Sequence, residues 1–352
     1  MTHLHRTSQR LAICAALVVA ALTGCGKSSS GDSLVKLQGA GASFPAPLYT
    51  RWFKSYNAAH PEVQVDYQSV GSGSGVKSVI DKTVDFGASD AAMTEEEIGR
   101  VQGGVQLLPV TAGSIVLTYN VEGVTDLKLS REAYAGIFLG RIKSWNDPTI
   151  AATNPGAKLP SRPINVVVRA DSSGTTYVFT KHLSEINPEF AKSPGMNKMP
   201  AWPVGTRSKG NEGVTAAVKT TPGSIGYIEY GYAKSQNLPM AALENKAGAF
   251  VSADTKSGQA ALAGTPLPDD MIAWNSDPAA KEAYPIVTYT WIILYKQYQD
   301  PKKLEALRNI VKYALTQGQE SAEQLGYIPL PAEIAQKVLT SVDNVKAAQG
   351  QS

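Results

Sequence analysis

The chain has 352 residues, 43% of them hydrophobic and 18% charged, and its 33 Lys and Arg against 30 Asp and Glu give a net charge of +3. That length suggests about two domains, and the apolar fraction is ample for their cores. The low charge density and the nearly balanced signs argue against a disordered chain, a coiled coil and a dedicated nucleic-acid binder. Because the chain has only two Cys and four His, we expect neither a zinc framework nor a disulfide scaffold. We also expect no cofactor.

Residues 1–24 have the pattern of an export signal. A basic stretch precedes an apolar run from Leu11 to Leu22, and small residues follow. As a helix this run rises about 18 Å, well short of the ~30 Å hydrocarbon core, so we expect no permanent membrane span. The ending Leu22-Thr23-Gly24-Cys25 resembles the lipobox of bacterial lipoproteins, which implies cleavage before Cys25 and acylation of its thiol.

The segment after the signal is a predicted tether. Residues 25–34 are rich in Gly and Ser and have almost nothing to bury. Removal of the signal takes away Arg6, Arg10 and Cys14, which leaves 31 basic residues against 30 acidic ones and a net charge of about +1. With Cys25 acylated, the exported part has no pair of cysteines for a disulfide, so its stability must come from packing.

A helix and then a strand are predicted at the start of the exported part. The fourfold spacing of Leu48, Trp52 and Tyr56 predicts a helix that starts near Pro45 or Pro47. Apolar residues then alternate with polar ones in the next segment, which predicts a strand over residues 63–67.

The pattern continues with further helices and strands. Helical spacing over residues 76–84 predicts a helix after a Gly-rich turn. Residues 164–168 form an apolar run of the buried-strand type. This run leads through a turn of small residues into a helical stretch that contains Val178, Phe179 and Leu183.

The remaining segments complete an α/β pattern. Residues 291–295 predict a strand and 304–315 a helix, whereas 154–163 and 187–213 predict long surface connections. Glu95–Glu97 predicts an exposed first helical turn, where acidic side chains suit the helix dipole. Strand and helix alternate and no solenoid repeat is visible, so the predicted fold class is α/β.

Three turns share one design, with Gly, Ser or Thr where a helix should begin. They are Gly39–Pro45, Gly71–Gly75 and Asp171–Thr175. The first N–H groups of a helix are unpaired and carry a partial positive charge, so a tetrahedral oxyanion fits there and hydroxyls add donors. Because Ser, Thr and Gly are also ordinary helix caps, both interpretations stay open for any single turn.

The usual catalytic motifs fail on particular residues. Residues 71–78 resemble a P-loop, but Val76 stands where that motif needs Gly, and it also breaks the dinucleotide-binding pattern. Residues 87–91 end in Ala where a nucleophile elbow needs Gly. His60 and His182 are the two candidate bases after the signal, but His60 stands at a predicted helix end and His182 on the helix after Thr175, so we expect neither to act as a catalytic base. Asp and Glu do not cluster as metal ligands, so we predict no catalytic residue and no metal site.

Arg169 and Asp171 directly follow the apolar run 164–168. An ion pair at the surface is one interpretation of this spacing. The other is a ligand site, because α/β proteins place ligands beyond the carboxyl ends of their strands.

Seven stretches occur in one order over nearly the whole exported chain. They are Gly39–Pro47, Thr83–Asp90, Gly136–Trp145, Arg169–Thr175, Trp202–Gly205, Lys209–Gly213 and Gly223–Tyr230. Together they resemble the substrate-binding protein of the phosphate-specific ABC importer. The resemblance implies a type II periplasmic binding protein, in which two α/β lobes are joined by two crossing segments and enclose the ligand in the cleft. Lobe 1 is expected at residues 35–118 and 286–346, and lobe 2 at 119–285.

The resemblance also implies which residues contact phosphate. They are Ser43, Phe44 (through its backbone N–H), Ser72, Asp90, Arg169, Ser173, Gly174 and Thr175, with Asp171 supporting Arg169. Ser43 stands where Thr is common in the family, which keeps the hydroxyl. The order Ser72-Gly73-Ser74-Gly75 permutes the usual Ser-Ser-Gly-Gly, so both Ser72 and Ser74 stay open as the contact.

Asp90 is an unusual residue for an anion site. Arg169 brings one positive charge, and we expect Asp171 to pair with it. Most of the attraction for the anion must then come from N–H and O–H dipoles, and each charge-assisted bond contributes about 1.5–3 kcal/mol. An ionised Asp90 only accepts hydrogen bonds. Phosphate keeps a proton to donate to it and sulfate has none, a mismatch that can discriminate by about 10⁴ to 10⁵.

The sequence thus predicts a phosphate receptor without chemistry of its own. It would lie in the periplasm or at the cell surface, held to a membrane through Cys25, as a monomer without a nucleic-acid partner. Because the expected contacts come from both halves of the chain, phosphate should close a hinge, and the closed form would deliver it to the permease of an ABC importer. The alternatives are a phosphoester hydrolase that uses the same oxyanion cage, and a receptor for another tetrahedral oxyanion. Asp90 disfavours sulfate and molybdate, and arsenate stays open.

Overall fold

The computed structural model of the protein describes residues 34–263 and 265–348. The predicted signal peptide at 1–24, the acylated Cys25 and the tether up to residue 33 lie outside these residues. Among the described residues, no helix is both long enough and apolar enough to cross a membrane.

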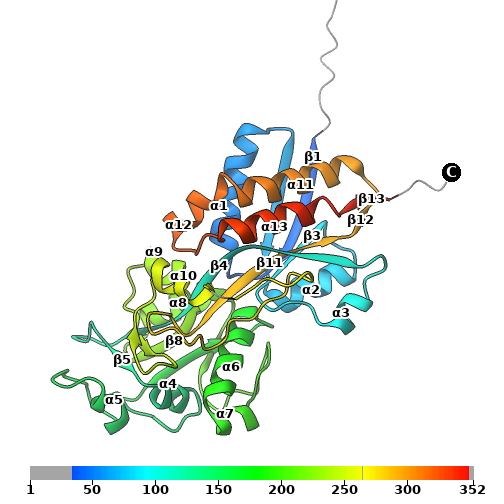
Figure 1. The fold of residues 1–352 in the computed structure, drawn as a ribbon. Helices are drawn as coiled ribbons and strands as arrows, with labels where there is room; N and C mark the ends of the chain where they lie inside the picture. The colour runs from blue at the N-terminus through cyan, green and yellow to red at the C-terminus, as the bar shows by residue number, and fades with distance from the viewer. Residues whose placement is uncertain (1–33, 264, 349–352) are drawn as a thin grey trace, which may run out of the picture. The chain divides into compact units, whose positions relative to one another are not determined.

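Helices and strands alternate along the described chain, as the predicted α/β class requires (Figure 1). The strands are β1 (Val35–Gly41), β2 (Val63–Ser69), β3 (Phe86–Ser89), β4 (Val105–Asn120), β5 (Lys128–Leu129), β6 (Asn165–Arg169), β7 (Thr206–Ser208), β8 (Ser224–Glu229), β9 (Ala242–Glu244), β10 (Phe250–Val251), β11 (Val287–Tyr295), β12 (Gln297–Tyr298) and β13 (Lys346–Ala347). The helices are α1 (Ala46–Ala59), α2 (Ser72–Ile80), α3 (Glu95–Gly99), α4 (Arg131–Phe138), α5 (Pro148–Ala152), α6 (Gly174–Ile186), α7 (Pro188–Lys192), α8 (Gly210–Thr220), α9 (Tyr230–Ser235), α10 (Thr255–Leu262), α11 (Pro301–Leu315), α12 (Gly318–Leu325) and α13 (Ala332–Val342).

Within the described residues, eight strands form one hydrogen-bonded series in the order β2-β1-β3-β11-β4-β8-β6-β7. β1 pairs in parallel with β2 and β3, and β6 pairs in parallel with β7 and β8. Between these two parallel groups lie the long antiparallel strands β4 and β11. Parallel neighbours need crossover connections, which explains why helices separate most of these strands.

Strand β4 links the two parallel groups because it changes partner midway. Its residues 105–114 pair with β11, and its residues 115–120 pair with β8 (Figure 1). The predicted lobe boundary at residue 118 falls on this strand, and the predicted boundary at residue 286 lies next to the start of β11. The boundaries themselves stay a prediction.

Helix α1 shows how the core forms. It begins at Ala46 with Pro47 in its first turn, which confirms the predicted start. The buried face consists of Leu48, Tyr49, Trp52, Phe53 and Tyr56. This face packs on β2, α11 and α12, and the Trp52 indole donates a hydrogen bond to the Gly318 carbonyl at 2.8 Å. Burial of each such large side chain contributes about 1.5–3 kcal/mol.

Most of the other predicted elements are confirmed. The strands predicted at 63–67, 164–168 and 291–295 correspond to β2, β6 and β11, and the helices after Thr175 and over 304–315 correspond to α6 and α11. Residues 154–163 form no helix or strand, as predicted.

Two predictions are wrong in their extent. The helix predicted over 76–84 is α2, which begins at Ser72 and ends at Ile80. Its first turn consists of small residues, which carry no apolar periodicity. The predicted surface connection 187–213 contains α7, β7 and the start of α8, and Asn211 within it is fully buried. These elements were missed because α7 and β7 are too short to show a period.

Candidate functional site

The predicted contact residues follow the carboxyl ends of strands in both parallel groups. β1 ends at Gly41 shortly before Ser43, and β3 ends at Ser89 directly before Asp90. In the other group, β6 ends at Arg169 itself. Open α/β sheets place ligands beyond these strand ends.

The first turns of α2 and α6 lie against each other. The Ser72 Oγ accepts the Asp90 N–H at 3.3 Å, and the Gly73 N–H donates to the Ser172 carbonyl at 2.9 Å. A Cβ atom on Gly174 would lie 2.4 Å from the Ser72 Oγ and 2.8 Å from the Asp90 Oδ2. No side chain fits at such distances, so glycine at position 174 is what allows the two helix N-termini to meet.

The cluster is almost completely enclosed. The exposed fractions are 1% for Ser43, 0% for Phe44, 0% for Ser72, 1% for Asp90, 2% for Arg169, 0% for Ser173 and 0% for Thr175. Gly174 is buried as well. Polar groups removed from water need hydrogen-bond partners, so the pairing of each group decides what the cluster can bind.

The buried Arg169 and the partly buried Asp171 form a two-bond ion pair. The Arg169 Nε and Nη2 lie 2.9 and 2.5 Å from the Asp171 Oδ1 and Oδ2. Oδ1 also accepts the Gly210 N–H at 3.0 Å. Burial by itself would raise the pKa of Asp171, but the Arg169 bonds and charge together with this N–H hold it below its usual range. The pair predicted from the sequence is therefore present, and Arg169 Nη1 extends to the Thr175 Oγ1 at 3.3 Å.

Asp90 lies in the opposite electrostatic environment. Burial raises its pKa to about 7, although a hydrogen bond from the Thr290 hydroxyl at 2.9 Å, the Arg169 charge and the Thr175 hydroxyl oppose the rise. When few positive charges offset the desolvation of a carboxylate, a partner that donates a hydrogen bond to it is favoured. Asp90 can therefore select among anions by their protonation.

The two serines of the α2 turn differ in position. Ser72 is the first residue of the helix, fully buried and in contact with Asp90. Ser74 is exposed and lines a cavity of about 680 Å³ whose wall also includes Asp171 and Lys209. The geometry therefore brings Ser72, and not Ser74, into the enclosed cluster.

Ser173 acts as a helix cap in addition to its predicted role. Its Oγ accepts the Thr176 N–H at 3.0 Å at the start of α6. Phe44 buries its ring, and its carbonyl accepts the Tyr327 hydroxyl at 2.7 Å. The structure thus brings all eight predicted contact residues and Asp171 into one region.

Three residues of this region were missed from the sequence. Asn211 donates a hydrogen bond to the Ser43 Oγ, and Thr290 donates one to Asp90. Glu229 is fully buried, and this burial raises the pKa of its carboxyl group well above the usual range. Asn211 belongs to the motif Lys209–Gly213, which was the available signal for it. Thr290 and Glu229 lie inside or at the end of strands and have no pattern that separates them from structural residues.

Other candidate features lie elsewhere. His182 is buried beside the Tyr134 hydroxyl at 2.9 Å, and burial lowers its pKa to about 4. In the residues that the structure describes, no group of three or more His, Cys, Asp or Glu could hold a metal ion.

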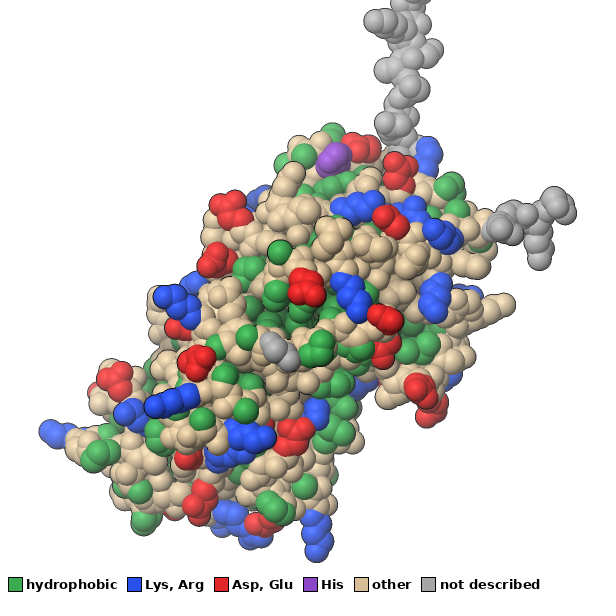
Figure 2. All heavy atoms as spheres, viewed as in Figure 1, with side chains coloured by type: hydrophobic (Ala, Val, Ile, Leu, Met, Phe, Trp, Pro, Cys, Tyr) green, Lys and Arg blue, Asp and Glu red, His purple; other side chains and the backbone are tan. Residues whose placement is uncertain are grey.

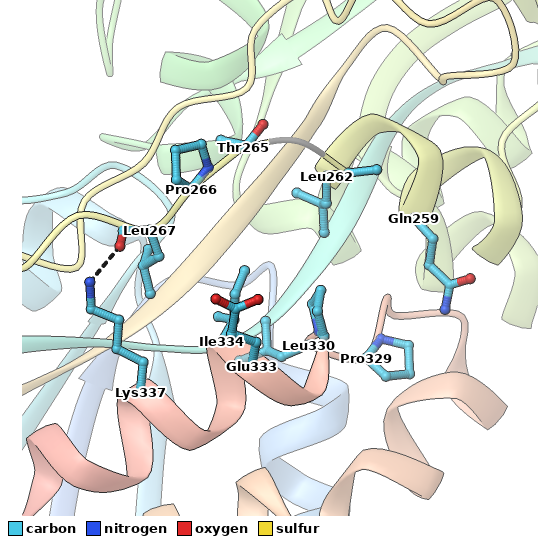
Figure 3. Close-up of a pocket in the computed structure, with 12 residues that line it drawn as sticks. Gln259, Leu262, Thr265, Pro266, Leu267, Pro329, Leu330, Glu333, Ile334 and Lys337 are labelled. Carbon is cyan, nitrogen blue, oxygen red and sulfur yellow. Dashed lines mark hydrogen bonds between the residues drawn. The ribbon is translucent and has the colours of Figure 1, made fainter.

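A cavity of about 720 Å³ lies between α10 and α13, lined by apolar residues such as Leu262, Leu330 and Ile334 (Figure 3). The Lys337 Nζ donates to the Leu267 carbonyl at its edge. Hydrophobic side chains also gather near the middle of this face of the molecule (Figure 2). None of the predicted contact residues lines this cavity, so it is separate from the polar cluster.

Comparisons with known proteins place the chain in a family. A model described as the PBP superfamily domain matches residues 26–316. The phosphate-binding protein PstS of Pasteurella multocida is 40% identical over 323 residues, which cover 90% of this chain and 92% of that protein. The chain belongs to the PstS family of phosphate-binding proteins. The PstS protein of Methanocaldococcus jannaschii, 34% identical over 96% of this chain and 95% of its own, extends the family match to an archaeon.

Solved structures support the two-lobed α/β fold of this PstS-family chain. A high-affinity periplasmic phosphate-binding protein with bound phosphate superposes with a TM-score of 0.73 at 20% identity, over 90% of this chain and 100% of that one. A substrate-binding protein from Clostridium perfringens, described as that of a putative phosphate ABC transporter and solved with phosphate, gives a TM-score of 0.60 at 16% identity, over 84% and 100%. At such identities the likeness concerns the fold alone.

Proposed function

We propose that the protein binds inorganic phosphate outside the cytoplasmic membrane and delivers it to an ABC importer. The observation that carries the proposal is the enclosed carboxyl group of Asp90 among oxyanion donors at the N-termini of α2 and α6. A site for a fully deprotonated oxyanion has no use for such an acceptor, whereas phosphate has a proton to donate to it.

The phosphate contacts that we assign are Ser43, Phe44 through its N–H, Ser72, Asp90, Arg169, Ser173, Gly174 and Thr175. Arg169 is held in position by Asp171, and its paired charge leaves hydrogen-bond dipoles as the main attraction. The closeness of Ser72 to Asp90 favours Ser72 over Ser74 as the serine of the α2 turn.

Phosphate binding would close the two lobes around the ligand. Contacts between the segment before residue 118 and the segment after it support this: Glu97 pairs with Lys198 at 3.1 Å, and Gly73 binds Ser172. We assign lobe 1 to residues 35–118 and 286–346 and lobe 2 to 119–285. X-ray scattering tests closure, because the radius of gyration of phosphate-free protein should fall when phosphate is added.

The importer and the membrane anchor are inferred from the family and the sequence. PstS relatives are named as phosphate-binding proteins, and a receptor of this kind would pass its ligand to the permease subunits of the importer. Acylated Cys25 would hold the monomeric protein to a membrane, in the periplasm or at the cell surface. Mass spectrometry of the protein from its native membrane tests the acylation.

Calorimetry with phosphate and with sulfate tests the function itself. We expect tight phosphate binding and weak sulfate binding, and a protein that binds both equally would contradict the role of Asp90. An assay with p-nitrophenyl phosphate tests the alternative of a phosphoester hydrolase. We expect no turnover, because His182 pairs with Tyr134 away from the cluster and no group of three or more His, Cys, Asp or Glu among the described residues could hold a metal ion.

A further inference from the structure

We propose that Asn211 orients the Ser43 hydroxyl so that its proton is reserved for the bound anion. Asn211 is the second residue of α8 and is fully buried. It lies 168 residues after Ser43 in the sequence, and the two belong to the two segments that we assign to different lobes. The inference rests on the proposed phosphate site and concerns how one of its donors is prepared.

The Ser43 hydroxyl accepts two hydrogen bonds from the same residue. The Asn211 backbone N–H lies 3.0 Å from the Ser43 Oγ, and the Asn211 Nδ2 lies 2.8 Å from it. A hydroxyl group has two acceptor lone pairs and one proton. Because both lone pairs are engaged, Ser43 can act toward a further partner only as a donor.

In the part of the chain that the structure describes, no group accepts the Ser43 proton. Among the described residues, the Ser43 Oγ has no acceptor within hydrogen-bond distance, and the side chain is cut off from solvent at 1% exposure. A buried donor without an acceptor costs stability. An oxyanion in the cluster supplies that acceptor, so the arrangement favours an anion there.

The orientation of the Asn211 amide is itself determined. Its Oδ1 accepts the Glu229 backbone N–H at 2.9 Å, where β8 ends. A flipped amide would place its NH₂ group against this N–H and its oxygen against Ser43, which would then direct its proton to Asn211. The Glu229 N–H therefore decides that Nδ2 faces Ser43.

The same amide also contacts a hydroxyl from its own segment, that of Thr175. Asn211 Nδ2 lies 3.3 Å from the Thr175 Oγ1, which also accepts from Arg169 Nη1 at 3.3 Å. The Thr175 proton then remains for Asp90 or for the anion. One buried amide thus makes donors of two hydroxyls, one from each of the segments that we assign to the two lobes.

A double-mutant cycle measured by calorimetry with phosphate tests this positioning role. We expect Asn211→Ala to weaken phosphate binding about 10- to 100-fold, because the Ser43 proton loses its orientation. In a Ser43→Ala background the same change should cost at most about threefold, since the Ser43 hydroxyl is gone and the Thr175 hydroxyl is still held by Arg169. Losses that multiply in the double variant, or an unchanged affinity of Asn211→Ala, would overturn the inference.

Controls separate this outcome from general damage. Asn245→Ala removes an equally buried Asn that binds the Lys281 and Ala283 carbonyls away from the site, and should lower the melting temperature without changing affinity. Should Asn211→Ala not fold, Asn211→Asp keeps the shape and the Glu229 contact but accepts the Ser43 proton, and unchanged binding by it would equally overturn the role. A wild-type protein that binds no phosphate would overturn the proposed function, and with it this inference. If the wild-type protein binds phosphate but the losses of Asn211→Ala and Ser43→Ala multiply, only this inference is overturned.

Discussion

Asp90 and Asp171 are two carboxyl groups of one enclosed cluster with opposite properties. Asp171 accepts two hydrogen bonds from Arg169 and one from the Gly210 N–H, which more than offset its desolvation and lower its pKa. Asp90 accepts a hydrogen bond from Thr290, but burial dominates and raises its pKa to about 7. The Arg169 charge is thus paired with Asp171 and offsets the desolvation of Asp90 only in part.

The two segments that build the proposed site therefore have different expected effects on binding. In the proposed site, the segment after β4 supplies Arg169 with its partner Asp171 and would bind tetrahedral oxyanions in general. The segment before β4 supplies Asp90, which would distinguish oxyanions by whether they have a proton to donate. Affinity and selectivity should therefore respond to different substitutions.

The largest effect is expected from Arg169→Met. Loss of the guanidinium removes charge-assisted bonds to the anion and leaves the Asp171 carboxylate beside the anion without its cation, so phosphate affinity should fall at least about 10³-fold in calorimetry. Arg131→Met is the matched control, because Arg131 forms a two-bond pair with Asp277 at 2.6 and 2.8 Å outside the cluster. It should lower the melting temperature and leave phosphate affinity unchanged. Equal losses of affinity in both variants would contradict the assignment of Arg169.

Asp90→Asn should change selectivity. The amide can donate to sulfate, so the preference for phosphate over sulfate should fall by at least about 100-fold when both anions are measured by calorimetry. Asp171→Asn is the matched control: it weakens the support of Arg169 and should reduce binding of both anions by similar factors. If the two variants changed the preference equally, the division between the two carboxyl groups would be wrong.

The pH dependence of sulfate binding follows from the raised pKa of Asp90. Burial favours the protonated form, so Asp90 can donate to sulfate below about pH 7 and becomes an acceptor above it. Sulfate affinity should therefore rise about tenfold between pH 8 and pH 6, and Asp90→Asn should remove the rise. A rise that persists in the variant would assign the titration to another group.

The sequence was a good guide to those parts of the site that begin helices. Ser72, Gly174 and Thr175 stand in turns of small residues, and such turns have a local physical meaning that can be read without a structure. The alternation of strands and helices predicted the fold class for the same reason. No local pattern predicted that the three turns lie at one site. That prediction needed the seven stretches in family order.

The residues that the sequence did not reveal act over long distances. Thr290 meets Asp90 across 200 residues, and on the buried strand β11 it looks like any other β-branched residue. Asn211 was assigned to a surface connection, although it is buried and meets Ser43 across 168 residues. Tertiary contacts of this kind depend on how the two parallel groups of strands come together, which no local spacing encodes.

The smallest expected effect distinguishes Ser72 from Ser74. It tests on which side of the first turn of α2 the anion lies. The Ser72 Oγ accepts the Asp90 N–H inside the enclosed cluster, which leaves its proton for the anion. We expect Ser72→Ala to weaken phosphate binding about tenfold, the effect of losing one buried hydrogen bond. Ser74 is exposed on the wall of a neighbouring cavity, so Ser74→Ala should change affinity less than about twofold. Each variant removes one serine hydroxyl from the first turn of α2, so a general effect on the helix would appear in both. A larger loss in Ser74→Ala would mean that the anion lies on the outer side of this turn, away from Asp90, and would remove the basis for selection by protonation.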